Sequence, residues 1–337
     1  MEAWLYETTQ EKRVRCRLCS HMCVIGPGKR GICGVRENQD GILHTKVYGR
    51  LIAANDDPVE KKPLFHLMPG SRSFSIATVG CNFKCRFCQN ADIAQMPADR
   101  NGMVAGDRAT PEQVVSAALN RNCASIAYTY TEPTIFFEFA CDTAKLAHQQ
   151  GIKNVFVTNG FMSAEALDWV SPWLDAANVD LKAFSDDFYK HQCAARLEPV
   201  KETLRQMKRL GIWVEVTTLI IPGLNDDPSD LTRLASFIAQ ELGSETPWHV
   251  SRFHPTYRLT DRGPTPVETL LQAREIGTGA GLHFVYTGNI PGHGGENTVC
   301  PGCGATAIFR QGFLITQNRL EQGRCSACAT PIQGIDM

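Results

Sequence analysis

The sequence predicts an α/β fold in which a parallel sheet forms an incomplete barrel between two cysteine-rich modules. Apolar runs typical of buried strands alternate with longer helical runs from residue 73 onward. This alternation implies right-handed β-α-β units and therefore a parallel sheet. About seven predicted strands favour an open barrel over a complete eightfold one. Both ends of the chain lack long periodic elements and are rich in cysteine.

The predicted elements follow one another at regular intervals. Strands are expected at residues 74–79, 124–130, 153–157, 177–181, 214–221, 248–253 and 283–286. Thr110 and Gln113 form a capping box with Pro111 at the first helical position, which predicts a helix towards Asn122. Further helices are expected after Pro133, after Ser163, and near 197–210, 227–242 and 265–279. The resulting units are 1–71, 72–290 and 291–337.

Composition and charge exclude several classes of protein. The 337 residues are 43% hydrophobic and 20% charged, which is typical of a globular chain. A formal net charge of -1 gives no electrostatic case for nucleic acid or an anionic membrane. No segment approaches the ~18 uninterrupted apolar residues of a membrane span, and the N-terminus lacks the pattern of a secretory signal. We therefore expect a cytoplasmic protein.

Cysteine is the unusual residue of this chain. Eleven of the 14 cysteines fall into three tight groups, and Cys123, Cys141 and Cys193 lie outside them. A reducing compartment disfavours disulfides, so grouped thiols indicate metal binding.

The central group, Cys81, Cys85 and Cys88, has the spacing C-x-x-x-C-x-x-C directly after the first predicted strand. Three thiolates in one loop can each bind one iron of a cubane cluster. The fourth iron then has no cysteine from this loop, and an open coordination position is a mark of catalysis. A three-cysteine zinc site with a remote histidine is the alternative.

This pattern resembles the radical S-adenosylmethionine (SAM) superfamily, in particular the branch of the pyruvate formate-lyase activating enzymes, over roughly Ser73 to Tyr286. The resemblance implies a (β/α)6-type barrel and a 4Fe–4S cluster ligated by the three central cysteines. SAM would chelate the fourth iron and be cleaved reductively to methionine and a 5′-deoxyadenosyl radical. That radical would abstract hydrogen from a substrate, as in an oxidoreductase or lyase.

The resemblance also implies a set of SAM-binding residues. Glu132 would contact the SAM amine, Asp180 the ribose and Lys182 the carboxylate, with His254 on the adenine side. The turn of Thr158, Asn159 and Gly160 resembles a cofactor-binding turn of the family. Other readings remain for these residues: a helix N-terminal carboxylate for Glu132, a mutual salt bridge for Asp180 and Lys182, and an ordinary core or surface residue for His254.

The terminal groups contain four cysteines each. Cys300, Cys303, Cys325 and Cys328 form two C-x-x-C knuckles, which predict a structural zinc ribbon, with rubredoxin-like iron or a redox dithiol as alternatives. Zinc and an auxiliary 4Fe–4S cluster both fit the N-terminal group, and spacing cannot decide between them. This group consists of Cys16, Cys19, Cys23 and Cys33.

The order of these modules is similar to that of the radical SAM component of the AmmeMemoRadiSam system. This resemblance implies AMMECR-family and Memo-family proteins as partners, with an external electron donor of flavodoxin or ferredoxin type. It names no substrate.

Three other functions compete with this interpretation. The chain could activate a glycyl radical enzyme, as the best-known relatives of the branch do. A non-catalytic iron–sulfur protein for electron transfer or scaffolding would produce no 5′-deoxyadenosine from SAM. RNA modification rests on the predicted ribbon alone, and the chain lacks a basic patch interleaved with aromatic residues.

Overall fold

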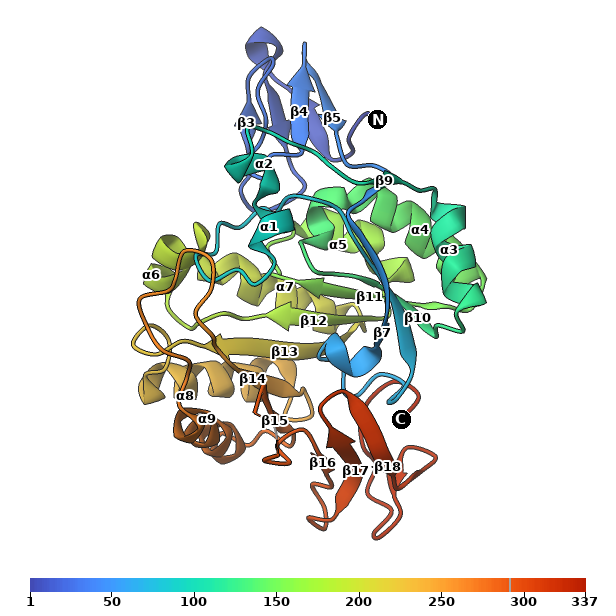
Figure 1. The fold of residues 1–337 in the computed structure, drawn as a ribbon, viewed down its shortest axis with the longest axis vertical. Coiled ribbons are helices and arrows are strands. Elements are labelled where there is room, and N and C mark those ends of the chain that lie inside the picture. Colours follow the sequence, from blue (N-terminus) through green and yellow to red (C-terminus); the bar gives the residue numbers. More distant parts are fainter. Residues whose placement is uncertain (291) are drawn as a thin grey trace.

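The core is one open sheet of eight strands in the described part of the chain, residues 1–290 and 292–337 of a computed structural model (Figure 1). The strand order is β15-β14-β13-β12-β11-β10-β8-β7, and all pairs from β8 to β15 are parallel. The strands are β7 (Ala53–Pro58), β8 (Arg72–Ala77), β10 (Ser125–Tyr128), β11 (Lys153–Thr158), β12 (Ala176–Asp180), β13 (Trp213–Ile220), β14 (Trp248–Arg252) and β15 (Val285–Gly288). The incomplete parallel barrel is therefore confirmed.

Strand β7 is the main departure from the sequence prediction, which places no strand before residue 74. It pairs antiparallel with β8, from Ala53 opposite Ala77 to Pro58 opposite Arg72. An edge strand is hydrogen-bonded on one side only, so it tolerates the charges and the terminal proline of this run. One sheet thus contains strands from both sides of the predicted boundary at residue 72. Pro291, the first residue of the predicted C-terminal unit, lies outside the described residues.

The helices connect successive parallel strands and begin close to their predicted starts. Thr110 and Gln113 form the reciprocal hydrogen bonds of the capping box, and Ser163 caps the helix that follows it. The α-helices are α1 (Ala91–Ala94), α2 (Met96–Asp99), α3 (Pro111–Asn120), α4 (Phe137–Gln149), α5 (Ala164–Val170), α6 (Asp186–Phe188), α7 (Leu197–Arg209), α8 (Pro228–Phe237) and α9 (Val267–Gly279). Shorter helical turns are η1 (Gln10–Lys12), η2 (Val59–Lys61), η3 (Pro133–Phe136), η4 (Ser171–Trp173), η5 (Tyr189–Cys193) and η6 (Ile238–Leu242).

The two faces of the sheet have different partners. Ile126 and Tyr128 belong to the large core shared with the helices, whereas Ala127 packs in a second cluster with Val59 and Leu64. Alternate residues of a strand point to opposite faces, so the segment around residues 59–67 covers the face away from the helices.

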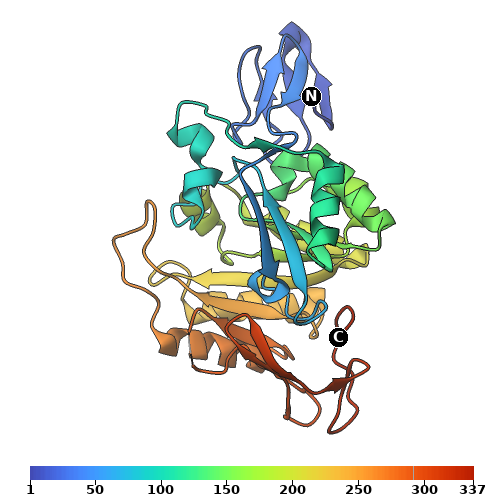
Figure 2. The same cartoon turned by 45° about the vertical axis from the view of Figure 1, so that its right-hand side comes forward.

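Two small modules lie at opposite ends of the molecule (Figures 1 and 2). The N-terminal module contains β1 (Tyr6–Thr8), β2 (Val14–Cys16), β3 (Val24–Ile25), β4 (Arg36–Gln39) and β5 (Ile42–Thr45), and β6 (Arg50–Leu51) pairs with β9 (Asp107–Arg108). The C-terminal module contains β16 (Thr298–Val299), β17 (Thr306–Gln311), β18 (Leu314–Asn318), β19 (Leu320–Glu321) and β20 (Arg324–Cys325). No helix in the described ranges is long and apolar enough to cross a membrane.

A buried polar network joins the C-terminal module to the sheet. His66 Nδ1 donates to the carbonyl oxygen of Gln333 (2.6 Å), and His66 Nε2 lies 2.6 Å from the hydroxyl of Tyr286. Arg310 donates to the carbonyl oxygen of Phe65 at 2.9 Å, and the backbone N–H groups of Phe65 and His66 donate to the carboxylate of Glu215. The network matches a neutral His66, whose second ring nitrogen accepts from Tyr286.

This network predicts a pH-dependent stability. Burial lowers the pKa of His66 to about 4, below the value of roughly 6.5 expected in the unfolded chain. The folded state therefore binds this proton less readily than the unfolded chain does. The contribution of neutral His66 to the unfolding free energy is fully present above pH ~6.5 and is lost as the pH falls towards 4. We expect this residue to account for about 3 kcal/mol of unfolding free energy across that window.

The measurement is urea unfolding at several pH values between 4 and 7 for the wild type and for His66→Gln. Glutamine can keep both hydrogen bonds but does not titrate, so the variant should lose much of this pH dependence. An identical pH dependence in both proteins would contradict the assignment to His66.

Candidate active site

The loop after β8 carries the central cysteines to the carboxyl edge of the parallel strands. Gly80 begins the loop with φ +102°, and a Cβ there would lie 2.7 Å from the side chain of Val35. Glycine is therefore required where the N-terminal module packs against the loop. Phe83 and Phe87 are buried, and Phe83 meets Phe161 with ring centroids 5.2 Å apart. The aromatic residues between the cysteines thus anchor the loop to the core.

The three central thiols are protonated in the metal-free chain. Burial raises the pKa of Cys81 well above its usual range and that of Cys88 to about 11. A hydrogen bond with Cys193 and then burial raise the pKa of Cys85. A bound metal would displace these protons, because the thiolate is the ligand.

The central thiols are gathered less tightly than those of the C-terminal group. Among the described residues, only the C-terminal cysteines bring three or more His, Cys, Asp or Glu ligand atoms within 4.8 Å of one another. The sulfurs around one zinc ion lie about 3.8 Å apart, given Zn–S distances of about 2.3 Å. A cubane offers a separate iron to each thiolate, so it does not require such a compact group.

The carboxylate of Glu132 connects the ends of β10 and β11. Its Oε1 accepts hydrogen bonds from Thr158 Oγ1 (2.7 Å) and from the backbone N–H of Thr134 (3.1 Å), and Oε2 accepts from the backbone N–H of Asn159 (2.8 Å). Asn159 Nδ2 in turn donates to Asn82 Oδ1 (2.7 Å) and lies 3.8 Å from Cys81 Sγ. Burial raises the pKa of Glu132. The structure thus brings Glu132, Thr158 and Asn159 together beside Cys81.

Lys182 lies at the same edge, next to the thiols. Its Nζ is 2.9 Å from Asp180 Oδ2 and 5.7 Å from the centre of the Phe87 ring. Burial opposes its charge, but the carboxylate of Asp180 raises the pKa of Lys182 above its usual range. The side chain is therefore a cation and can bind a ligand carboxylate.

Three residues that support this site were not singled out as site residues by the sequence. Asn225 Nδ2 donates to the carbonyl oxygen of Lys182 at 2.6 Å, and the hydroxyl of Tyr189 accepts from the N–H of Lys182 at 3.0 Å. Cys193, fully buried, contacts Cys85. These contacts join residues distant in sequence, so local patterns do not predict them. His254, by contrast, is exposed beyond the end of β14.

The C-terminal cysteines have the geometry of a single-ion site. Cys300 Sγ lies 3.6 Å from Cys328 Sγ, and Cys303 Sγ lies 3.8 Å from Cys325 Sγ. All four sulfurs are within 4.8 Å of one another. Tetrahedral thiolate ligands of one zinc ion would lie about 3.8 Å apart. This group can hold a metal ion with little rearrangement.

The N-terminal cysteines also converge on one site. Cys16, Cys19, Cys23 and Cys33 line one small pocket, together with Asn82 of the central loop. Burial raises the pKa of Cys19, and the three other thiols of the group raise it further. Within the described residues these four sulfurs do not meet the 4.8 Å spacing of the C-terminal group.

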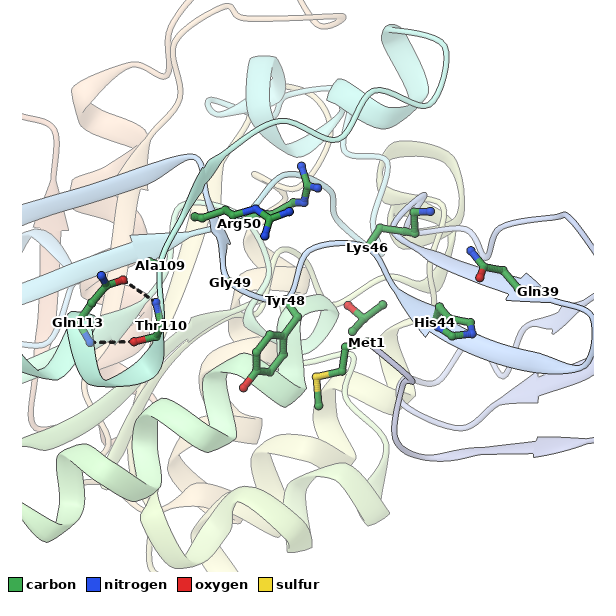
Figure 3. A pocket seen from close by; sticks show the side chains of 12 residues that line it. Met1, Gln39, His44, Lys46, Tyr48, Gly49, Arg50, Ala109, Thr110 and Gln113 are labelled. Atoms are coloured by element: carbon green, nitrogen blue, oxygen red, sulfur yellow. Dashed lines mark hydrogen bonds between the residues drawn. The ribbon is translucent and has the colours of Figure 1, made fainter.

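A larger cavity of about 700 Å³ lies between the N-terminal module and α3 (Figure 3). Lys46, Arg50 and Arg108 line it, and the hydrogen bonds between Thr110 and Gln113 close one side. None of the residues predicted to bind metal or SAM lines this cavity.

Comparisons with known proteins agree with this geometry. Residues 75–235 match the model of the radical SAM superfamily. The chain is 47% identical over 333 residues to the uncharacterized protein MJ0808 of Methanocaldococcus jannaschii, covering 98% of each chain. It is 24% identical over 176 residues to a pyruvate formate-lyase-activating enzyme of Clostridium pasteurianum, covering 50% of this chain and 70% of that one. A radical SAM methyltransferase from Sphaerobacter thermophilus shares the fold, with a TM-score of 0.51, 16% identity and 70% of each chain covered.

The contacts of Glu132 predict a cost for removing its charge. Glu132→Gln would turn an amide NH₂ towards the N–H of Asn159 or towards the N–H of Thr134, leaving a buried donor without an acceptor. We expect a loss of about 2–3 kcal/mol in unfolding free energy, measured by urea titration. Glu112→Gln, at the exposed start of α3, is the matched control and should leave the midpoint nearly unchanged. Equal midpoints for the two variants would refute the structural role of Glu132.

Proposed function

Because the chain belongs to the radical SAM superfamily, we propose that Cys81, Cys85 and Cys88 hold a 4Fe–4S cluster at which SAM is cleaved reductively. The bound cluster would supply the electron that splits SAM into methionine and a 5′-deoxyadenosyl radical. That radical abstracts hydrogen from a small-molecule or protein substrate. The observation that carries the proposal is the position of three cysteines in the loop after β8, at the carboxyl edge of the sheet, with the ammonium of Lys182 beside the same loop.

The polar residues at this edge have separate tasks in SAM binding. Lys182 offers its ammonium to the SAM carboxylate, and the half-exposed carboxylate of Asp180 accepts hydrogen bonds from ribose hydroxyls. Glu132 holds Thr158 and Asn159 in place, and we retain it as the contact for the SAM amine. His254 contributes on the adenine side, where its exposed position leaves it free to pack against a ligand.

The flanking modules support a place in the AmmeMemoRadiSam system, with AMMECR-family and Memo-family proteins as partners. An external one-electron donor of flavodoxin or ferredoxin type would supply the reducing equivalent. Activation of a glycyl radical enzyme is the second candidate, favoured by the similarity to the Clostridium pasteurianum activating enzyme. A glycyl radical signal in a partner protein, measured by electron paramagnetic resonance after incubation with the reduced enzyme and SAM, would select the second candidate.

We further propose that Cys300, Cys303, Cys325 and Cys328 bind structural zinc. The sulfur separations of 3.6 and 3.8 Å support one tetrahedral ion. Cys300 and Cys325 pack with Phe65 and Tyr286 at the base of the sheet, so the metal would stabilise the docked module.

The zinc proposal predicts a defined change in metal content. A Cys303→Ala/Cys328→Ala double variant should lose about one zinc ion per chain while keeping its iron. Metal analysis by mass spectrometry measures both, with Cys141→Ala, buried in α4, as the control that changes neither. Loss of iron in place of zinc would indicate a rubredoxin-like centre and contradict the proposal.

The proposal that this chain cleaves SAM can be tested by substituting two neighbouring cysteines, Cys85 and Cys193, one at a time. Cys85→Ala removes a cluster ligand, so formation of 5′-deoxyadenosine under anaerobic reducing conditions should fall by about 100-fold or more. Cys193→Ala removes the thiol in contact with Cys85 and should retain most of the activity. Equal product from the wild type and Cys85→Ala would end the proposal, and loss of the cluster in Cys193→Ala would make Cys193 a ligand.

A further inference from the structure

We propose that Cys16, Cys19, Cys23 and Cys33 hold a second 4Fe–4S cluster that passes electrons to the cluster at the central loop. The presence of a second cluster stands on the N-terminal module alone. Its role as an electron relay rests on the proposed function. Three features support it: the four thiols converge on one pocket, they are less compact than the C-terminal group, and the two sites share a wall.

The N-terminal fold brings the four thiols to one pocket. Cys16 ends β2, and its N–H donates to the carbonyl oxygen of Cys23 at 2.9 Å, so the two lie across a hairpin. Cys33 lies within the turn that the N–H of Gly34 closes on the carbonyl oxygen of Gly31 (2.9 Å). Leu18, Ile25 and Ile135 line the same pocket. An apolar pocket ringed by four thiols excludes water from a bound centre and suits a cluster of soft inorganic sulfide.

The C-terminal group provides a contrast within the same molecule. Its four sulfurs lie within 4.8 Å of one another, as one ion requires. Among the described residues, neither the N-terminal nor the central thiols form such a compact group. The N-terminal thiols therefore differ from the group that is already arranged for a single ion.

The N-terminal pocket and the central loop are in direct contact. Asn82, the residue after Cys81, lines the pocket, and its carbonyl oxygen lies 2.8 Å from His21 Nε2. On the other side of Cys81, a Cβ on Gly80 would lie 3.0 Å from the carbonyl oxygen of Cys33. Both residues that flank a ligand of one site therefore touch the other site. A zinc staple needs no such proximity, whereas electron transfer between clusters does.

A buried cation adjoins the N-terminal sulfurs. Arg36 Nη1 lies 3.5 Å from Cys16 Sγ, and its guanidinium is paired with the buried carboxylate of Glu138. Hydrogen bonds to cluster sulfurs and nearby positive charge favour the reduced form. This arrangement lets the N-terminal cluster accept an electron from outside.

The electron count of the relay is simple. A low-potential one-electron donor of flavodoxin or ferredoxin class would reduce the N-terminal cluster, and the same electron would then move to the central cluster. There it is consumed when the bond between sulfur and C5′ of SAM breaks. The sulfur keeps the electron pair as methionine, and C5′ is left as the radical. No proton is transferred in these steps.

The test removes the central ligands and counts what remains. A Cys81→Ala/Cys85→Ala/Cys88→Ala variant, reconstituted anaerobically, should still contain about four irons and four sulfides per chain, with one zinc. After reduction it should show one cluster signal by electron paramagnetic resonance. About two zinc ions and no iron would overturn the proposal. Counting iron and sulfide needs no SAM cleavage. The second cluster can therefore be refuted while the proposed function stands, and the proposed function can be refuted while the second cluster stands.

The complementary variant keeps the proposal falsifiable should the triple variant fold poorly. Cys19→Ala/Cys23→Ala should contain about half the iron and sulfide of the wild type and keep the cluster at the central loop. It should form 5′-deoxyadenosine with dithionite, yet do so at least about tenfold more slowly with reduced flavodoxin. Unchanged iron content would overturn the second cluster, and an equal loss with both reductants would overturn the relay.

Discussion

The carboxylate of Glu132 is the contact on which the arrangement of the site depends. Its oxygens take hydrogen bonds from Thr134, Thr158 and Asn159, and Asn159 continues to Asn82 and towards Cys81. The ends of three parallel strands are thus fixed relative to one another by a single buried group. Because an unpaired buried carboxylate would be costly, each of these donors is needed in place. Through Asn82, these contacts also hold the loop of Cys81, Cys85 and Cys88 in place.

Much of the fold could be predicted because its signals are local. The capping box at Thr110, the cap at Ser163 and the alternation of apolar strands with helices all act within a few residues, and all appear in the structure. Strand β7 could not be predicted, because its two aspartates and its proline contradict strand propensity. It forms by pairing with β8, a tertiary contact that outweighs the local preference.

The residues of the candidate site fall into the same two groups: those predictable from local sequence and those placed by tertiary contacts. The cysteine spacing and the strand-end pair Asp180 and Lys182 are readable in the sequence, since each lies in one short segment. The positions of Asn225, Tyr189 and Cys193 around them are not, because each contact joins different elements of the sheet edge. Sequence spacing likewise cannot separate zinc from a cluster at four cysteines. At the C-terminal group the folded chain adds information, since sulfur separations of 3.6 and 3.8 Å match those around one ion.

The two flanking modules are both rich in cysteine but dock at opposite ends of the strands (Figure 1). The C-terminal module sits at the amino ends of the strands, held by Arg310 on Phe65 and by His66, far from the thiol loop in both views (Figures 1 and 2). A metal there can act only through stability. The N-terminal module packs on the carboxyl edge, where Val35 and the carbonyl of Cys33 abut Gly80. A centre bound by its thiols would lie against Asn82, the residue next to Cys81, so its charge would act close to the central loop. Position relative to the strand ends, more than cysteine number, therefore separates the two modules.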